Sequence, residues 1–157
     1  MKITLILNGK TDDDYIVKGC SVYESRLKYY IPFETIIIPA LKNTKALSID
    51  QQKQKEGELL LKCIQPSDKL ILLDENGKEY HSVGFSEFIQ QQMNSGIKNL
   101  VFVVGGPYGF SEEIYKRANG KISLSKMTFS HQMVRLFFAE QLYRAMTILR
   151  NEPYHHQ

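Results

Sequence analysis

The strongest constraint on the fold is an alternation between short apolar runs and longer segments of helical periodicity. The runs are rich in Val, Ile and Leu and far shorter than the roughly 18 residues of a membrane span. They cover residues 2–7, 33–38, 69–73, 101–104 and 122–124. Most of the segments between them carry apolar residues every three or four positions. This pattern predicts an α/β protein with a largely parallel sheet and helices on both faces, in a single domain over residues 1–157.

Composition sets wide bounds on function. The chain is 43% hydrophobic and 24% charged, as soluble globular proteins are. A net charge of +3 permits an anionic partner without requiring one. Cys20 and Cys63 lack metal-ligand spacing, so we interpret both as reduced core residues and predict no metal site. No membrane span or signal peptide is recognisable, which makes the cytoplasm the expected location.

Two glycine-containing segments resemble phosphate-binding loops but have the wrong spacing. Gly9-Lys10-Thr11 resembles the end of a P-loop, yet that motif needs a glycine five positions before Gly9, where Thr4 stands. Residues 105–109, Gly-Gly-Pro-Tyr-Gly, lack the Gly-x-Gly-x-x-Gly of a dinucleotide site. Their first two glycines serve turn geometry or let a ligand lie against the main chain, and the residues alone leave both interpretations open.

Three loops at the ends of predicted strands are the candidate ligand site. They follow Leu73 and Val104 and cover residues 124–129, Leu-Ser-Lys-Met-Thr-Phe. If the strands are neighbours, the loops converge on one crevice at the carboxyl edge of the sheet. Its walls would be apolar and its polar groups mainly backbone. Such a crevice suits a flat purine with an attached thioether better than a polyphosphate.

The segment after Ser130 predicts a long helix that is apolar over most of its circumference. One apolar stripe follows helical spacing through Val134, Phe138, Leu142, Ala145 and Leu149. A sheet face covers less than this surface, which favours a dimer interface. Arg135 falls within the apolar arc, where a charge should be paired or directed at an anionic ligand. Glu140 and Arg144 are four residues apart and are expected to pair.

Taken together, these residues make the sequence similar to the SPOUT superfamily of S-adenosylmethionine-dependent RNA methyltransferases. Each matching segment is weak evidence by itself, but the order and spacing of the segments over the whole chain make the resemblance specific. The segments are Met1-Lys2-Ile3 with Gly9-Lys10, Lys55-Glu56-Gly57, Leu73-Asp74 followed by Gly77-Lys78, residues 105–109, residues 124–129, His131-Gln132, Arg135, residues 140–145 and Pro153-Tyr154-His155.

The resemblance implies a homodimer, a C-terminal trefoil knot and S-adenosyl-L-methionine as cofactor. More narrowly, the sequence is similar to family members that N3-methylate a pseudouridine in 23S ribosomal RNA, with the assembled ribosome as substrate. A tRNA methyltransferase of the same superfamily and a non-catalytic nucleotide-binding module are the alternatives. The cofactor-binding positions implied are Leu73, Gly105, Gly106, Leu124, Ser125, Lys126, Met127, Thr128 and Phe129.

The resemblance also suggests roles in catalysis and RNA binding. The expected catalytic group comprises Tyr154, His155 and His131 as candidate bases, with Arg135 as electrostatic helper. The tail either frays or orders over the substrate, in its own subunit or across the dimer. The expected RNA-binding residues are Arg144, Lys116 and Arg117, joined by Lys126.

Two positions depart from the family pattern. Ser130 stands where related sequences have proline, and because serine is a good N-cap we expect the helix start to survive. His156 and Gln157 follow His155, where the family places a basic residue, so a terminal phosphate contact is in doubt.

Overall fold

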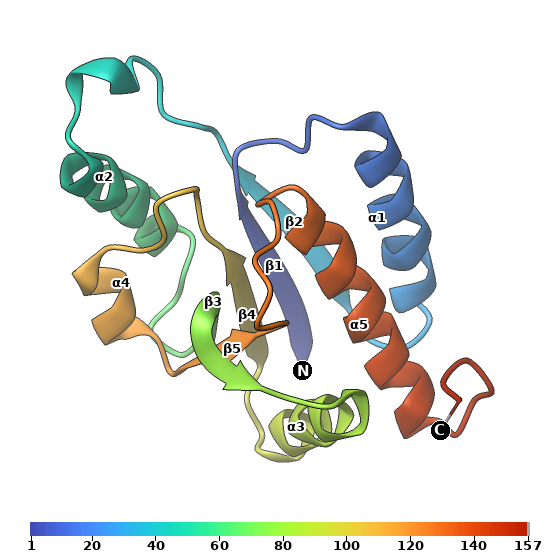
Figure 1. Cartoon of the computed structure of the whole chain (residues 1–157). Helices are drawn as coiled ribbons and strands as arrows, with labels where there is room; N and C mark the ends of the chain where they lie inside the picture. Colours follow the sequence, from blue (N-terminus) through green and yellow to red (C-terminus); the bar gives the residue numbers. More distant parts are fainter. Residues whose placement is uncertain (157) are drawn as a thin grey trace.

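A five-stranded parallel sheet is the centre of the molecule (Figure 1). The computed structural model describes residues 1–156. Its strands are β1 (Lys2–Asn8), β2 (Phe33–Ile38), β3 (Lys69–Glu79), β4 (Asn99–Val104) and β5 (Gly120–Ser123). They lie in the order β2-β1-β4-β3-β5, and every neighbouring pair is parallel. The predicted parallel sheet is confirmed.

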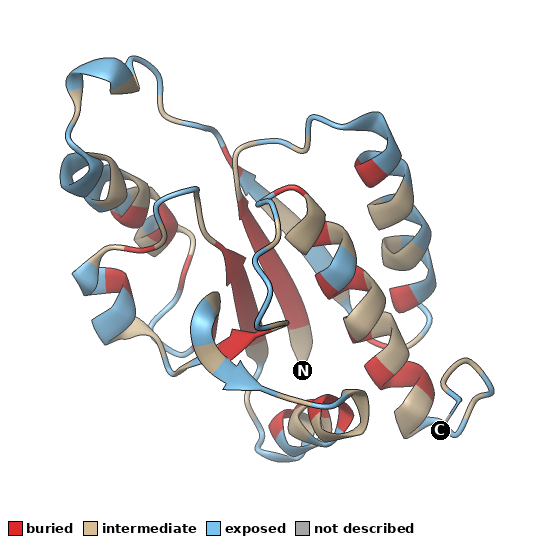
Figure 2. Ribbon diagram, in the orientation of Figure 1, coloured by how far each residue is buried: buried red, intermediate tan, exposed pale blue. Residues whose placement is uncertain are grey.

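Helices cover both faces of this sheet, as predicted. They are α1 (Asp14–Leu27), α2 (Ile49–Lys62), α3 (Ser82–Asn94), α4 (Glu112–Arg117) and α5 (Met133–Leu149), with a short 3₁₀ helix, η1 (Thr44–Ala46). The helices α1, α3 and α5 pack on one face around Phe102 and Phe138, while α2 and α4 pack on the other around Leu70 and Ile114. The central strands β1 and β4 are accordingly almost entirely buried, whereas β2 and the far end of β3 are more exposed (Figure 2). Within residues 1–156, no helix is both long and apolar enough to cross a bilayer.

At the start of three helices, a serine hydroxyl accepts a hydrogen bond from a backbone N–H group. Ser48 forms a capping box with Gln51 at the start of α2, and the Ser111 hydroxyl accepts from the Ile114 N–H at the start of α4. The Ser130 hydroxyl likewise accepts from the Met133 N–H, with 3.1 Å between Oγ and N. The helix start therefore survives, as predicted, but Ser130 bonds to it from the preceding turn, and Gln132 occupies the N-cap position of α5. The helix α4 was not predicted, because six residues are too few to show a period.

The end of β3 differs from the prediction. A loop is predicted directly after Leu73, but the strand continues to Glu79 through a bulge that sets both Leu73 and Lys78 opposite Ile122. A Cβ at Gly77 would lie 2.5 Å from the carbonyl carbon of Ile122. Only glycine permits this approach, so Gly77 serves the crossing of β3 and β5 and not a turn.

The apolar surface of α5 is covered within the chain more fully than its sequence suggests. The helix lies between α1 and α3, and a Cβ at Gly19 would come within 2.8 Å of the Leu136 side chain. The helices α1 and α3 thus bury sides of α5 that were expected to be covered by a partner subunit. An outer ridge remains, where Phe137 is 38% exposed. The homodimer stays a prediction that needs other support.

Candidate active site

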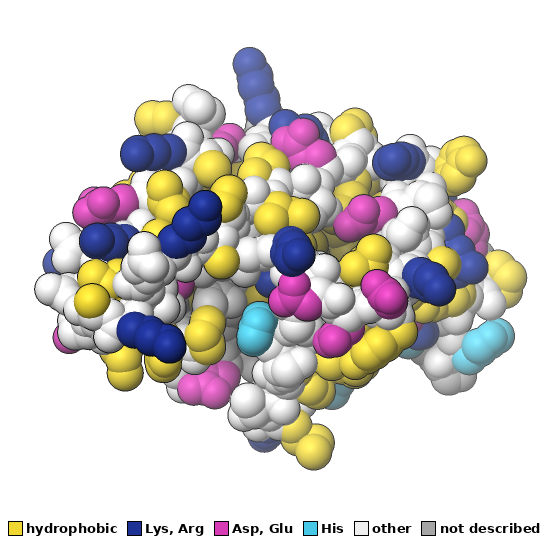
Figure 3. Space-filling view, turned by 90° about the horizontal axis from the view of Figure 1, so that it is seen from above, with side chains coloured by type: hydrophobic (Ala, Val, Ile, Leu, Met, Phe, Trp, Pro, Cys, Tyr) yellow, Lys and Arg dark blue, Asp and Glu magenta, His cyan; other side chains and the backbone are white. Residues whose placement is uncertain are grey.

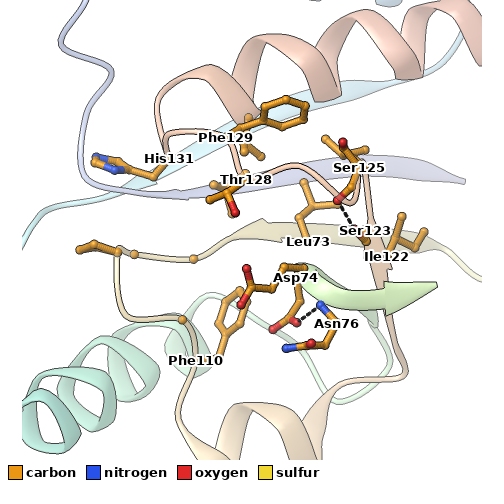
Figure 4. A pocket seen from close by; sticks show the side chains of 18 of the residues that line it. Leu73, Asp74, Asn76, Phe110, Ile122, Ser123, Ser125, Thr128, Phe129 and His131 are labelled. Carbon is orange, nitrogen blue, oxygen red and sulfur yellow. Dashed lines mark hydrogen bonds between the residues drawn. The ribbon is translucent and has the colours of Figure 1, made fainter. Parts of the chain in front are cut away.

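The carboxyl ends of β3, β4 and β5 surround a cavity of about 520 Å³ (Figure 4). The register aligns Leu73 with Val104 on one side and with Ile122 on the other, so the three following loops meet. The convergence expected from the sequence is therefore present. The lining comprises residues 73–76, 104–110, 122–125 and 127–131, together with Tyr115 and Val134.

Most of the expected cofactor-binding residues gather around this cavity. The lining includes Leu73, Gly105, Gly106, Leu124, Ser125, Met127, Thr128 and Phe129, whereas Lys126 lies in the same loop outside the lining. His131, one of the candidate bases, also lines the cavity. Thr128, Phe129 and His131 lie on one side, and Asp74, Asn76 and Phe110 lie on the other (Figure 4).

Short-range contacts fix the loop that follows β5. The Ser123 hydroxyl donates to the Ser125 carbonyl, and the Ser125 hydroxyl accepts from the Met127 N–H, each with 2.9 Å between the heavy atoms. The ring of Phe129 packs on Phe137 of α5, with 4.7 Å between centroids. One wall of the cavity is thus tied to both β5 and α5.

The two glycines after β4 let the loop pack closely against neighbouring side chains. A Cβ at Gly105 would meet the Phe110 ring at 3.0 Å, and one at Gly106 would meet the Asn8 amide and the Glu56 carboxylate at the same distance. A side chain at either position would therefore point at other protein atoms. Of the two interpretations left open by the sequence, the structure favours local geometry, because side chains here would push the loop off its support.

Arg135 is buried behind the cavity and not aimed into it. It is 1% exposed. Its Nη1 donates to the Gly9 carbonyl and the Thr11 hydroxyl, Nη2 to the Asn8 carbonyl, each at 2.9 Å, and Nε to the His131 carbonyl at 3.2 Å. Burial lowers its pKa. Arg135 thus ties the loop after β1 to the start of α5 and supports the His131 backbone, while its expected role as electrostatic helper stays a prediction.

The C-terminal tail docks on the last turns of α5. The Tyr154 hydroxyl donates to Glu140 Oε1 at 2.9 Å, and the Arg144 guanidinium carbon lies 4.8 Å from the Tyr154 ring centroid. His155 Nδ1 is 3.2 Å from Arg144 Nη1. The expected Glu140–Arg144 ion pair is present. Burial, followed by hydrogen bonding with Tyr23 and Glu140, raises the pKa of Tyr154.

A single chain does not bring the tail to its own cavity. His131 and Val134 line the cavity at the first turn of α5, whereas the tail contacts Arg144. Glu140, which Tyr154 contacts, and Arg144, which His155 contacts, lie six and ten positions after Val134, or about 9 and 15 Å of helix rise. The described part of the tail, which ends at His156, lies at the far end of α5 from the carboxyl edge of the sheet (Figure 1). The candidate bases are therefore divided between two ends of one helix.

The expected RNA-binding residues are also dispersed. The Lys116 ammonium is paired with Glu112 at 2.9 Å, although its side chain is 75% exposed. The Arg117 guanidinium donates to the carbonyls of Gln65 and Asp68 at 2.9 and 3.0 Å. Arg117 therefore supports the connection before β3, and a phosphate would have to compete with these carbonyls.

The carboxyl end of the sheet presents charges of both signs. Lys, Arg, Asp and Glu side chains are interspersed with hydrophobic ones on this face, without a continuous stretch of one sign (Figure 3). Within residues 1–156, no three His, Cys, Asp or Glu side chains are grouped as a metal site. The face as a whole therefore has no dominant charge.

Comparison with known proteins identifies the family. A family model described as "Predicted SPOUT methyltransferase" matches residues 1–155. The chain belongs to the SPOUT methyltransferase family. The resemblance found in the sequence is thereby confirmed, and with it the fold class, which in this family includes the C-terminal trefoil knot.

Individual SPOUT methyltransferases are similar to this chain over its whole length. The chain is 65% identical to the ribosomal RNA large subunit methyltransferase H of Flavobacterium johnsoniae. It is 64% and 63% identical to the proteins of the same name from Christiangramia forsetii and Parabacteroides distasonis. Each alignment spans 157 residues and the full length of both chains.

Three residues around the cavity were not assigned a role from the sequence. Asp74 accepts from the Tyr115 hydroxyl at 2.5 Å, and Phe110 lies edge-on to Tyr115 with 5.8 Å between ring centroids. The position of Asp74 directly after an apolar strand was an available signal. Tyr115 belongs to the unpredicted helix α4, so only the tertiary structure could reveal it.

Proposed function

We propose that this chain transfers a methyl group from S-adenosylmethionine to N3 of a pseudouridine in 23S ribosomal RNA, acting as a homodimer on the assembled ribosome in the cytoplasm. The observation that carries the proposal is the cavity formed where β3, β4 and β5 end. Its loops are the segments on which the family resemblance rests, and the full-length similarity to ribosomal RNA methyltransferases supports the substrate class.

The cavity fits the proposed cofactor in size and chemistry. Its volume of about 520 Å³ lies in the range of small-molecule sites, and Leu73, Leu124 and Phe129 contribute apolar walls suited to a purine. Its lining includes no Lys or Arg among the described residues, which disfavours a polyphosphate. When bound, S-adenosylmethionine supplies a methyl carbon whose bond to sulfur breaks as its bond to N3 forms, and the electron pair of the broken bond stays on sulfur.

The chain's own residues then orient the reactants and accept the N3 proton. Tyr154 is a poor base, because burial and its neighbours raise the pKa of its hydroxyl, which stays protonated near neutral pH. It serves as a hydrogen-bond donor instead. His131, in the lining, and His155, in the tail, are the remaining candidates to take the proton.

The separation of cavity and tail supports action across a dimer. A two-fold axis that pairs the α5 helices in opposite directions would place each tail beside the partner's cavity. Two exposed hydrophobic side chains lie on the corresponding surface, Phe137 at 38% and Met127 at 77% exposure. In this arrangement Lys116, Lys126 and Arg144 would contact RNA phosphates, with binding that weakens as salt rises.

Methyl transfer to defined substrates tests the function. Labelled S-adenosylmethionine is offered with 70S ribosomes, 50S subunits and tRNA from cells that lack the enzyme. We expect labelling of ribosomal RNA at one pseudouridine N3. Label confined to tRNA would identify a tRNA methyltransferase, and cofactor binding without transfer to any RNA would identify a non-catalytic module.

Tail truncation and subunit mixing test the composite site. Truncation after Pro153 should leave cofactor binding intact and abolish transfer. Thr128→Trp places an indole at the cavity edge and should block the cofactor. A co-expressed heterodimer of these two chains retains one complete site if the tail acts across the interface, so about half of the wild-type activity is expected. An inactive heterodimer would show that the tail acts within its own subunit.

A further inference from the structure

The cavity lining is acidic in a chain that is basic overall. Asp74 and Glu75 follow the apolar part of β3 and both line the cavity. The described lining includes no Lys or Arg, whereas the whole chain has a net charge of +3. Two carboxylates therefore act on whatever occupies the cavity without a neighbouring cation in its wall to neutralise them.

The Asp74 carboxylate is held in a fixed position at this wall. One oxygen accepts from the Asn76 N–H at 2.8 Å, and the other accepts from the Tyr115 hydroxyl at 2.5 Å. Burial, reinforced by the bond to Asp74, raises the pKa of Tyr115 to about 12, so its hydroxyl keeps its proton and remains a donor. The Lys121 ammonium lies 5.4 Å from the Tyr115 ring centroid and does not line the cavity. The carboxylate is thus oriented without a salt bridge.

We propose that Asp74 and Glu75 make the cavity select the methyl donor over the spent cofactor by charge. The inference rests on the proposed function. S-adenosylmethionine carries a sulfonium, an ammonium and a carboxylate, for a net charge of +1, whereas S-adenosylhomocysteine has lost the sulfonium charge and is net neutral. An acidic wall holds the first more tightly and releases the second, which favours turnover.

The size of the effect follows from the dimensions of the cavity. A volume of 520 Å³ corresponds to a sphere of about 10 Å diameter, so any bound group lies within that distance of the wall. At this range, in a partly hydrated site, one unit charge changes the affinity for a monovalent cation by about threefold to tenfold. The affinity for a neutral ligand changes little.

Calorimetric binding to the full-length protein tests the proposal without methyl transfer. Asp74→Asn and Glu75→Gln each remove one charge and keep the shape, and the single carbonyl oxygen of the asparagine keeps one of the two bonds that Asp74 accepts from Asn76 and Tyr115. The ligands are S-adenosylmethionine, S-adenosylhomocysteine and sinefungin, a cationic analogue with an amine in place of the methylated sulfur. Glu87→Gln is the matched control, because Glu87 is exposed on α3 and outside the cavity lining.

We expect each cavity variant to bind both cationic ligands about threefold to tenfold more weakly. S-adenosylhomocysteine should change less than about twofold, and the control should bind all three as the wild type does. Equal weakening of all ligands would mean that the carboxylates only shape the cavity and would overturn the inference, as would unchanged binding of the cations. Absence of cofactor binding by the wild type would instead overturn the proposed function. Because Glu75 is exposed, its variant remains informative even if Asp74→Asn folds poorly.

Discussion

Replacing Arg135 with methionine distinguishes a supporting residue from a reacting one. The guanidinium donates four hydrogen bonds, three of them to main-chain carbonyls. A hydrogen bond from a charged group contributes about 1.5–3 kcal/mol to stability. Because contributions within one cluster are not additive, the sum overstates the loss. We expect the free energy of unfolding to fall by about 3–5 kcal/mol, a large share of the 5–15 kcal/mol typical of a domain.

Urea denaturation followed by circular dichroism measures this loss. Arg135→Lys is the matched variant, because it keeps the charge but reaches fewer acceptors, and it should lose less stability than the methionine variant. Cofactor affinity and methyl transfer are measured in parallel under conditions where the variants are folded. If the methionine variant loses under about 1 kcal/mol of stability while transfer falls a hundredfold or more, Arg135 acts on the substrate and the positioning role is refuted.

Three further predictions follow from single contacts. Gly77→Ala places a methyl group 2.5 Å from the Ile122 backbone, so the free energy of unfolding should fall by about 2 kcal/mol or more in urea denaturation, and an unchanged midpoint would contradict the described bulge. Tyr115→Phe removes a hydroxyl whose pKa rises to about 12 on folding, which stabilises the folded protein at lower pH. The wild type should lose this stabilisation as pH rises from 10 to 12, and thermal melts of the variant should show a smaller decline over the same window. Phe137→Glu places a charge on the proposed interface and should give monomers by sedimentation equilibrium, while a dimer as tight as the wild type would exclude this face.

The sheet could be predicted from the sequence because its central strands are buried on both faces. Val101 to Val104 read as one apolar run, since side chains on both sides of β4 enter a core, and the same holds for β1. Strands buried on both faces are typical of parallel sheets, so the loops that follow them could be placed at one edge. The far end of β3 could not be predicted, because residues 74–77 carry turn-forming types and their strand conformation depends on Ile122 across the sheet.

The roles of individual site residues were harder to predict, because they depend on distant parts of the chain. Arg135 finds its partners at Asn8, Gly9 and Thr11, more than 120 residues away in the sequence. The helical period shows that a charged residue lies on the apolar side of the helix, but it does not show which groups the charge contacts. The surplus apolar surface of α5 likewise pointed to a partner chain, while α1 and α3 already cover much of it.

The order of strands has a consequence for how the chain acquires its structure. The central pair joins Lys2 with Asn99, so β1 reaches its inner neighbour only after about two thirds of the polypeptide exists. At about 5–20 residues per second, synthesis of that length takes roughly 5–20 seconds, during which one edge of a strongly apolar strand has no neighbour. Such long-range pairing slows folding and exposes nascent chains to aggregation. Fragments ending before residue 99 should therefore depend on chaperones, and β1 takes its final place only when β4, at the end of the second third of the chain, has been made.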